Sequence, residues 1–252
     1  MASLDYNEVA PEFDRRYKLH DYPGIQRCLL DLASDHDRAR VLEVGCGTGK
    51  WLSLFASVGC ELAGIEPSAQ MLALARARVN GDLREGAAEA LPWADAWFDC
   101  VVYINALHHF ADPLRALQES FRVLRPGGRL LSIGLDPHQR TGRWYIYEYF
   151  PAAIAADLAR FPSREQRTSW LRNAGFGDVM VRVVEHLQFT LPFDQAVQDG
   201  VLERSFTSQL GILSAEQYAA GMQRIRESAE KNEAFRLEVD LDLYSTVAQK
   251  PV

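Results

Sequence analysis

The feature that most constrains this chain is an apolar segment that leads directly into a turn with three glycines. Residues 41–49 read VLEVGCGTG, and apolar residues at helical spacing follow from Trp51 to Val58. Glycine has no Cβ, so the backbone of such a turn can approach a ligand closely. In a doubly wound α/β sheet, nucleotide-like ligands bind at the first strand-to-helix turn. The sequence therefore predicts such a sheet with a ligand at this turn.

Two other glycine-rich motifs fit this turn less well. A dinucleotide-binding turn has the pattern Gly-x-Gly-x-x-Gly, whereas the third glycine here, Gly49, comes one residue early. A P-loop requires Ser or Thr after its Gly-Lys pair, but Lys50 is followed by Trp51, which has no hydroxyl for magnesium. The spacing disfavours both a dinucleotide, as in NAD-dependent dehydrogenases, and a nucleoside triphosphate.

A carboxylate at the end of the next strand-like segment favours a nucleoside ligand. Glu66 lies 21 residues after Gly45 and is followed by Pro67 and Ser68. A carboxylate at this place can accept hydrogen bonds from both ribose hydroxyls. The alternative is an ordinary solvated charge at a strand end. The position after a glycine turn favours the ribose interpretation.

Strand-like segments alternate with helix signals along most of the chain. Ser68 and Asp112-Pro113 are typical helix starts, and capping-box patterns begin at Ser163 and Ser214. This alternation predicts a parallel sheet with helices on both faces. Strands are expected at residues 40–44, 61–66, a short segment ending near 86, 98–104, 129–135, 179–184 and 239–247, with a turn at 125–128.

Composition limits the environment and the partners of the protein. The net charge is −7, and the four cysteines are scattered without metal-ligand spacing. We therefore expect a cytoplasmic monomer or homodimer without a metal, which binds neither nucleic acid nor membranes. Arginine far outnumbers lysine, which occurs only at positions 18, 50, 231 and 250. This excess reflects either genome composition or arginines that bind an anionic substrate.

Five motifs in order resemble those of the class I S-adenosylmethionine (SAM)-dependent methyltransferases, in particular the type 11 group with the ubiquinone/menaquinone-biosynthesis enzymes. The resemblance is strongest over residues 36–135, and its motifs are 41–49, Glu66, 86–93, 98–110 and 124–130. It implies a Rossmann-like, doubly wound α/β fold whose seven-stranded sheet is mostly parallel with an antiparallel last strand. It also implies an enzyme that transfers a methyl group from SAM to a small molecule and releases S-adenosylhomocysteine.

The same resemblance implies a single methyltransferase domain with helical additions. Residues 1–35 would form an N-terminal helical cap, 36–187 the SAM-binding core, 188–236 a helical insert and 237–252 the final strand. The cap and the insert are expected to form a lid that excludes water from the site.

The resemblance also assigns residues to the SAM site. It places the glycine turn at the methionine part of SAM, Glu66 at the ribose, and the backbone of Ala88 at the adenine edge. Position 87, often an aspartate that holds the adenine amino group in this family, is an alanine here. The implied SAM-binding residues are Glu43, Gly45, Cys46, Gly47, Thr48, Glu66, Pro67, Ser68, Met71, Ala88, Glu89, Asn105, Ala106, Tyr17 and Tyr22.

Three side chains are candidates for the catalytic proton transfer. Histidine titrates near neutral pH, so His108 or His109 could serve as a general base. The alternative is that one of them packs under the end of the sheet while the other only lies near the cofactor. Tyr6 belongs to a segment that resembles the N-terminal helix of this family, where a tyrosine can hydrogen-bond the substrate or the carboxylate of SAM.

The segment 143–150 contains five aromatic residues in eight positions. These side chains either line a pocket for a planar substrate or pack the cap against the core. The sequence Asn-Ala-Leu-His from Asn105 differs from the motif typical of enzymes that methylate DNA or protein glutamine. An RNA or protein methyltransferase and a non-catalytic SAM-binding protein remain as alternatives. Substrate contacts are expected from Tyr6, His109, Arg143, Trp144, Tyr147 and Phe206.

Overall fold

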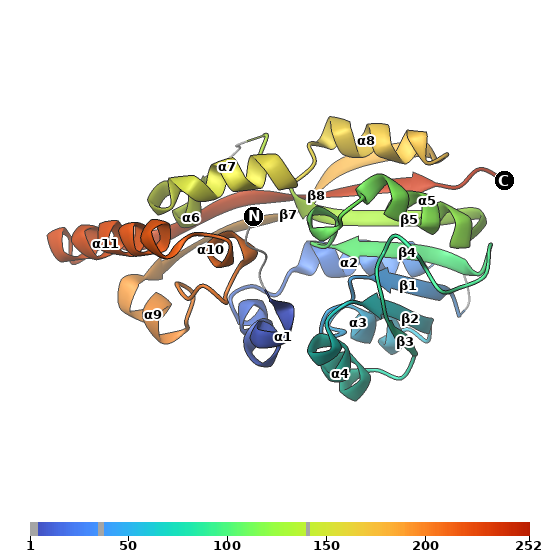
Figure 1. The fold of residues 1–252 in the computed structure, drawn as a ribbon, viewed down its shortest axis with the longest axis horizontal. Coiled ribbons are helices and arrows are strands. Elements are labelled where there is room, and N and C mark those ends of the chain that lie inside the picture. The colour runs from blue at the N-terminus through green and yellow to red at the C-terminus, as the bar shows by residue number, and fades with distance from the viewer. Residues whose placement is uncertain (1–4, 35–37, 140–141) are drawn as a thin grey trace. The chain divides into compact units, whose positions relative to one another are not determined.

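The computed structural model describes residues 5–34, 38–139 and 142–252. The chain divides into two compact units, which are described separately (Figure 1). The sheet unit comprises Tyr22–Asp136, Pro162–Glu185 and Leu243–Val252, and the helical unit comprises Met1–Asp21, Pro137–Phe161 and His186–Asp242.

A mostly parallel sheet with an antiparallel last strand confirms the predicted α/β class. In the described residues it has eight strands rather than seven, because the two-residue β6 also pairs. β5 pairs antiparallel with β8, from Arg129 opposite Gln249 to Leu135 opposite Leu243. The strands are β1 (Arg40–Val44), β2 (Glu61–Glu66), β3 (Asp82–Glu85), β4 (Phe98–Ile104), β5 (Leu124–Leu135), β6 (Arg143–Trp144), β7 (Gly177–Pro192) and β8 (Arg236–Gln249).

The strand order places a topological switch point at the carboxyl end of β1. β1 pairs in parallel with β2 on one side and with β4 on the other. The chain therefore leaves β1 toward one half of the sheet and returns to build the other half. Ligands of open α/β sheets bind at such a switch point, outside the carboxyl ends of the strands.

Helices cover both faces of the sheet unit. Successive residues of a strand point to opposite faces. Leu42 and Val44 pack in one core with residues of α5 and α8, whereas the Cys100 thiol faces the Leu32 carbonyl of α2 at 3.5 Å. The α5–α8 pair is visible in Figure 1. The helices of this unit are α2 (Pro23–Ala33), α3 (Leu52–Ser57), α4 (Ala69–Arg78), η2 (Leu107–His109), α5 (Pro113–Val123) and α8 (Arg164–Asn173).

Helices begin at the four capping residues expected from the sequence. In each case the side-chain oxygen accepts a hydrogen bond from the backbone N–H three residues later, which satisfies one of the free donors of the first turn. At Ser214 the Gln217 side chain also accepts from the Ser214 N–H, so the capping box is complete. The four caps are Ser68, Asp112, Ser163 and Ser214.

The helical unit has its own aromatic core. Phe150 stacks on Tyr218 with ring centroids 6.0 Å apart, and the buried Tyr145 hydroxyl donates to the Val201 carbonyl at 3.1 Å. Gly221 faces Phe150 so closely that a Cβ there would lie 2.1 Å from its ring. The helices of this unit are α1 (Tyr6–Val9), η1 (Ala10–Lys18), α6 (Tyr145–Tyr149), α7 (Pro151–Arg160), α9 (Phe193–Gln198), α10 (Ser208–Gly211) and α11 (Ala215–Lys231).

Two segments differ from the sequence expectation. The predicted helical insert 188–236 begins as strand, because β7 continues to Pro192 and its burial alternates between Glu185 and Thr190 as strand periodicity requires. The predicted turn at 125–128 lies inside β5 as an irregularity, since Phe98 pairs with Leu124 but Cys100 pairs with Arg129. Gly127 takes a φ of +77° there.

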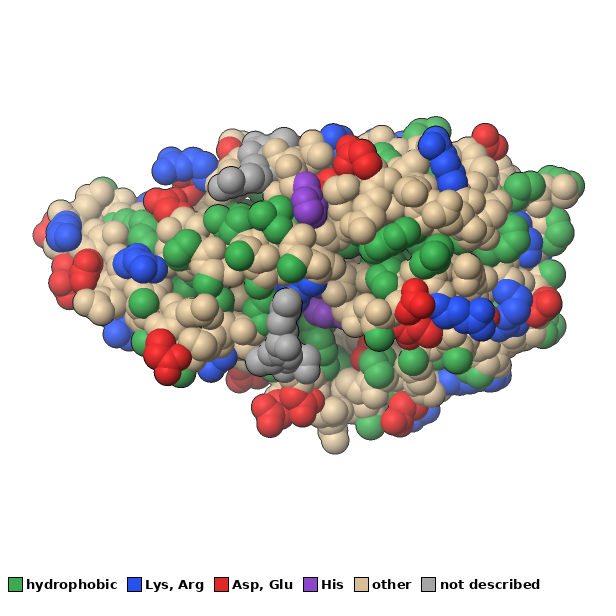
Figure 2. Space-filling model, turned by 45° about the horizontal axis from the view of Figure 1, so that its top comes forward, with side chains coloured by type: hydrophobic (Ala, Val, Ile, Leu, Met, Phe, Trp, Pro, Cys, Tyr) green, Lys and Arg blue, Asp and Glu red, His purple; other side chains and the backbone are tan. Residues whose placement is uncertain are grey.

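Charged side chains of both signs are interspersed on the described surface that Figure 2 shows. The mixture agrees with a chain whose net charge is −7.

A buried carboxylate is expected to stabilise the helical unit. Asp157 is fully buried and accepts hydrogen bonds from Tyr147 (2.6 Å), Arg160 (2.7 Å) and Gln209 (3.0 Å). Asp157→Ala leaves the Arg160 guanidinium without this partner, so we expect a loss of about 3 kcal/mol in the free energy of unfolding. Urea titration followed by circular dichroism measures it. The exposed Asp194→Ala in α9 is the control, with a loss of at most about 1 kcal/mol; equal losses would contradict the role of Asp157.

Candidate active site

The glycine turn folds tightly back onto the second strand. The N–H groups of Gly45 and Cys46 both donate to the Ile65 carbonyl, at 2.8 and 3.1 Å. Gly45 takes a φ of +73°, which side chains disfavour, and a Cβ there would lie 2.9 Å from the Cβ of Ala106. The turn and the end of β4 therefore approach each other at a distance that only glycine permits.

Glu66 joins the turn to the end of β2. Its Oε2 accepts from the Gly47 N–H and its Oε1 from the Ser68 N–H, both at 3.0 Å. The side chain is buried, with 7% of the residue exposed. Burial raises the pKa of Glu66, and the two N–H donors partly offset that rise. A carboxylate offers about four acceptor positions, so two remain for a ligand.

Glu43 places a second carboxylate beneath the turn. It is 2% exposed, and within the described residues its Oε2 has no hydrogen-bond partner. Burial, and next the negative charge of Glu66, raise the pKa of Glu43 well above its ordinary value. Burial also raises the pKa of the neighbouring Cys46 thiol, which therefore stays protonated at neutral pH. A ligand with a positively charged donor group fits this pair of carboxylates.

Side chains of α5 form hydrogen bonds with the backbone of the segment that follows β3. The buried Glu119 accepts from the Leu91 N–H at 3.0 Å and pairs with Arg122 at 2.8 Å. Arg122 in turn donates to the carbonyls of Leu91 and Trp93, both at 2.8 Å. Sequence reasoning missed this support, because charges on a helix are usually solvated. Of the predicted residues here, Ala88 is buried, and Glu89 accepts from the N–H of the α5 cap at 3.1 Å.

The end of β4 carries a backbone conformation that is rare outside glycine. Asn105 takes a φ of +52°, and its N–H donates to the Ile133 carbonyl at 2.8 Å. Such conformations occur preferentially at functional sites. Ala106 and Leu107 are buried, whereas His108 is half-buried and His109 is exposed, with their ring centroids 3.9 Å apart.

Two further contacts that the sequence did not reveal brace the turn and α2. Arg78, at the end of α4, donates to both the carbonyl and the hydroxyl of the buried Thr48, each at 2.8 Å. The buried Glu185 of β7 accepts from the Gly24 N–H at 2.8 Å and so caps α2. This fixes the chain beside Tyr22, whose ring lies edge-on to Trp51 at 6.1 Å.

The structure brings most of the predicted SAM-binding residues together at the carboxyl ends of β1, β2 and β4. Pro67 is exposed and Met71 is buried in α4. The remaining predicted residues belong to the helical unit. There Trp144 and Tyr147 are half-buried with ring centroids 5.0 Å apart, while Tyr145 and Phe150 of the same segment pack in the core. The other predicted residues of that unit are Tyr6, Tyr17 and Phe206, all half-buried, and the exposed Arg143.

Comparison with known proteins identifies the family. Residues 42–132 match the methyltransferase domain family. A demethylmenaquinone methyltransferase of Clavibacter sepedonicus is 30% identical over 211 residues, which cover 71% of this chain and 83% of that protein. The chain belongs to the class I SAM-dependent methyltransferases. This confirms the resemblance to the small-molecule, type 11 group.

Two further relatives agree with this assignment. A malonyl-[acyl-carrier protein] O-methyltransferase of Pectobacterium atrosepticum is 34% identical over 177 residues, which cover 61% of this chain and 70% of that protein. A solved SAM-dependent methyltransferase of Thermotoga maritima has the same fold, with a TM-score of 0.59, 22% identity and coverage of 97% of each chain.

The residues around the glycine turn have the chemistry that a bound SAM molecule requires. Glu66 has open acceptor positions, and Glu43 has an Oε2 without a hydrogen-bond partner among the described residues, so both suit the hydroxyl and amino donors of SAM. At Gly45 the missing Cβ lets a ligand approach the backbone closely. In the part of the chain that the structure describes, no group of His, Cys, Asp and Glu side chains could hold a metal ion. No helix of that part is long and apolar enough to cross a membrane.

A substitution of Gly45, whose backbone lies close to Ala106, tests the methyltransferase site. Gly45→Ala forces an unfavourable φ and a contact with Ala106, so we expect the affinity for S-adenosylhomocysteine to fall at least about tenfold. Isothermal titration calorimetry measures this on protein shown to be folded by circular dichroism. Gly177→Ala is the matched control, because a Cβ there meets nothing within 4 Å. An unchanged affinity in Gly45→Ala would contradict this role of the missing Cβ.

The buried Glu43 should make the stability of the methyltransferase depend on pH. Because its pKa is raised on folding, its contribution to stability is fully present below its ordinary value near 4.5 and is lost as the pH rises through the folded-state pKa. Glu43→Gln cannot ionise, so we expect it to gain about 1–3 kcal/mol over the wild type at pH 8. The gain should shrink toward pH 4.5, as measured by urea unfolding across that range.

The exposed Glu61→Gln in the same sheet is the control for this pH series. A difference between Glu43→Gln and wild type that does not change with pH would show that Glu43 is not the titrating group.

Proposed function

We propose that this methyltransferase binds SAM at the glycine turn and transfers its methyl group to a small planar or aromatic acceptor. The observation that carries the first part is the Glu66 carboxylate, which joins the turn to the end of β2 and keeps two acceptor positions open. The acceptor class is supported by the relatives that are named for demethylmenaquinone, and by the half-buried pair of Trp144 and Tyr147.

Each predicted SAM contact has a physical basis in this proposal. Glu66 would accept from the ribose hydroxyls, and the unpaired Oε2 of Glu43 would face the amino group of the methionine part. The backbone at Ala88 would read the adenine edge, and Asn105 would lie beside the methyl donor. When bound, SAM supplies an electrophilic methyl group on its sulfonium. The remaining SAM contacts in the proposal are Gly45, Cys46, Gly47, Thr48, Pro67, Ser68, Met71, Glu89, Ala106, Tyr17 and Tyr22.

The side chains of this enzyme would then position the acceptor and move one proton. Methyl transfer gains most from alignment of the reacting atoms and from exclusion of water. His109, exposed in η2 after the end of β4, and His108 beside it are candidate bases for an acceptor that must lose a proton. Tyr6 is the third candidate.

Residues of the helical unit would contact the acceptor itself. Asp157 accepts from the Tyr147 hydroxyl at 2.6 Å and so fixes the ring that packs against Trp144. Rigid aromatic faces of this kind suit a planar ligand. Arg143 and Phe206 complete the proposed contacts. Residues 1–35 and 188–236 would form the lid over a single domain, as the sequence analysis predicts.

Turnover by a Glu66 variant tests the proposed function. Glu66→Gln keeps the shape but removes the charge that the ribose hydroxyls bind, so we expect kcat/KM for SAM to fall about 10–100-fold. The assay follows S-adenosylhomocysteine formation with a demethylated naphthoquinone, simple phenols and a malonyl thioester as acceptors. Glu61→Gln, at the exposed start of the same strand, should retain full activity.

The choice of acceptor separates the alternatives. Turnover with the quinone or the phenols supports the proposal. Turnover with the malonyl thioester alone would show that the enzyme methylates a carboxylate oxygen and not a planar acceptor. SAM binding without turnover on any small molecule would contradict it, and would direct attention to protein or RNA substrates. A cytoplasmic location, a monomeric or homodimeric state, and independence of nucleic acid, membranes and metal remain predictions of the sequence analysis.

A further inference from the structure

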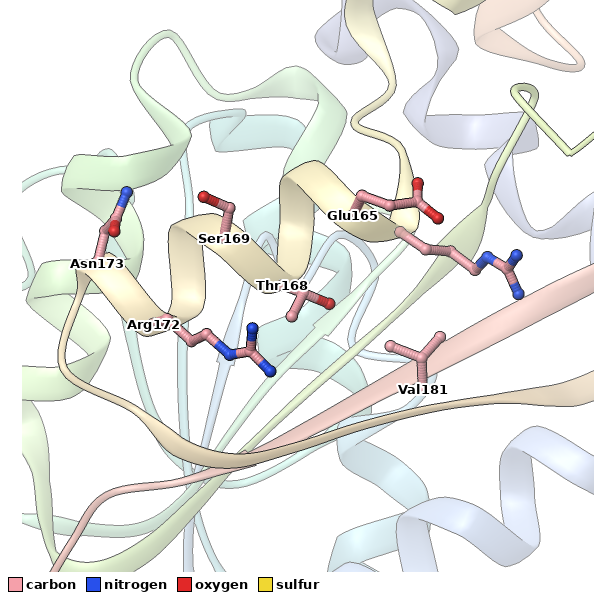
Figure 3. Close-up of a pocket in the computed structure, with 7 residues that line it drawn as sticks. Glu165, Thr168, Ser169, Arg172, Asn173 and Val181 are labelled. Carbon is pink, nitrogen blue, oxygen red and sulfur yellow. The ribbon is translucent and has the colours of Figure 1, made fainter.

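A groove lies between α8 and β7 in the sheet unit, apart from the glycine turn. It has a volume of about 470 Å³. Arg164, Thr168 and Arg172 line it from the helix, and Val181 lines it from the strand (Figure 3). α8 packs beside α5, whereas the glycine turn leads into α3, which packs against α2 on the other face. None of the residues that line this groove belongs to the SAM or acceptor site proposed above.

The helix presents two positive charges along one face of the groove. Arg164, Thr168 and Arg172 are spaced four residues apart, so they lie on the same side of α8. Figure 3 shows Thr168 and Arg172 pointing toward the strand that carries Val181. In the described residues neither Thr168 nor Arg172 forms a side-chain hydrogen bond or an ion pair with the protein. Their donors are therefore available to a ligand.

A buried arginine under the same helix adds to the positive charge. Arg167 is 2% exposed, and its hydrogen bonds to Thr246 (3.4 Å) and to the Pro162 carbonyl (3.5 Å) are long. Within the described part of the chain its Nε has no hydrogen-bond partner. A buried charge is unfavourable unless it is paired.

The Asp136 carboxylate interacts with two guanidinium groups near the start of α8. Asp136, buried at the end of β5, accepts from the Arg164 N–H at 3.0 Å and lies 3.7 Å from the Arg164 Nε. The negative charge of Asp136 also acts on Arg167. Asp136 thus interacts with two of the three arginines of α8, and the groove lining adds Arg172 and one acidic residue, Glu165, so positive charge is in excess here. An anion in the groove would lower the free energy of this arrangement.

We propose that the groove is a second ligand site, which binds a small molecule through a diphosphate group. Arginine binds phosphate oxygens with two parallel hydrogen bonds, and the Thr168 hydroxyl adds a donor between the two arginines. Eight residues of helix place Arg164 and Arg172 about 12 Å apart along the axis. Two long side chains across this span suit a ligand with more than one charged phosphate oxygen better than a single carboxylate. The arginine excess of the sequence would then serve anion binding at this place.

Calorimetry with pyrophosphate on the full chain tests this site. At low ionic strength we expect saturable binding of one pyrophosphate, which weakens as NaCl is added because the contacts are charge pairs near the surface. Arg172→Gln removes an exposed side chain that has no partner among the described residues, so the fold should persist and the affinity should fall at least fivefold. Thr168→Val should weaken binding less. Arg27→Gln, an exposed arginine of α2, is the matched control and should leave the affinity unchanged.

S-adenosylhomocysteine titrations of the same variants keep this proposal separate from the function proposed above. Normal binding of S-adenosylhomocysteine by Arg172→Gln, together with weakened binding of pyrophosphate, supports a separate groove site. No saturable pyrophosphate binding, or equal losses in Arg172→Gln and Arg27→Gln, would overturn the proposal. Displacement of pyrophosphate by S-adenosylhomocysteine would also overturn it, because it would place both at one site.

Discussion

The site depends on one buried carboxylate that holds two segments of backbone in place. Glu66 accepts from the Gly47 N–H of the glycine turn and from the Ser68 N–H at the start of α4, each at 3.0 Å. These bonds fix the positions of the turn and the strand end before any ligand arrives. A preorganised site of this kind loses little free energy to ordering when it binds.

Buried charge is the other recurring feature of the sheet unit. Burial raises the pKa values of both Glu43 and Glu66, and the negative charge of Glu66 adds to the rise for Glu43. Such an arrangement is unfavourable in an isolated protein and is typical of functional sites. A ligand that brings a positive charge relieves it. Arg167 beneath α8 is the corresponding buried positive charge, and its Nε has no hydrogen-bond partner among the described residues.

Local sequence patterns predicted most of the fold. The strand 98–104 and the four helix caps agree with the structure because the apolar runs and capping residues act over a few neighbouring positions. The extension of β7 to Pro192 was missed although Leu187, Phe189 and Leu191 alternate with polar residues at strand spacing. The residues of the glycine turn and Glu66 were recognised from their spacing. Arg78, Glu119 and Glu185 were not, because contacts across 28 to 161 residues leave no local signal.

The most direct test of the central claim is a crystal structure of the protein with bound S-adenosylhomocysteine. The account predicts that the ligand lies at the carboxyl ends of β1, β2 and β4, with both ribose hydroxyls donating to Glu66 and with the adenosine close to Gly45. A ligand located elsewhere, or a ribose bound by other side chains while Glu66 contacts only its two backbone N–H groups, would contradict the account.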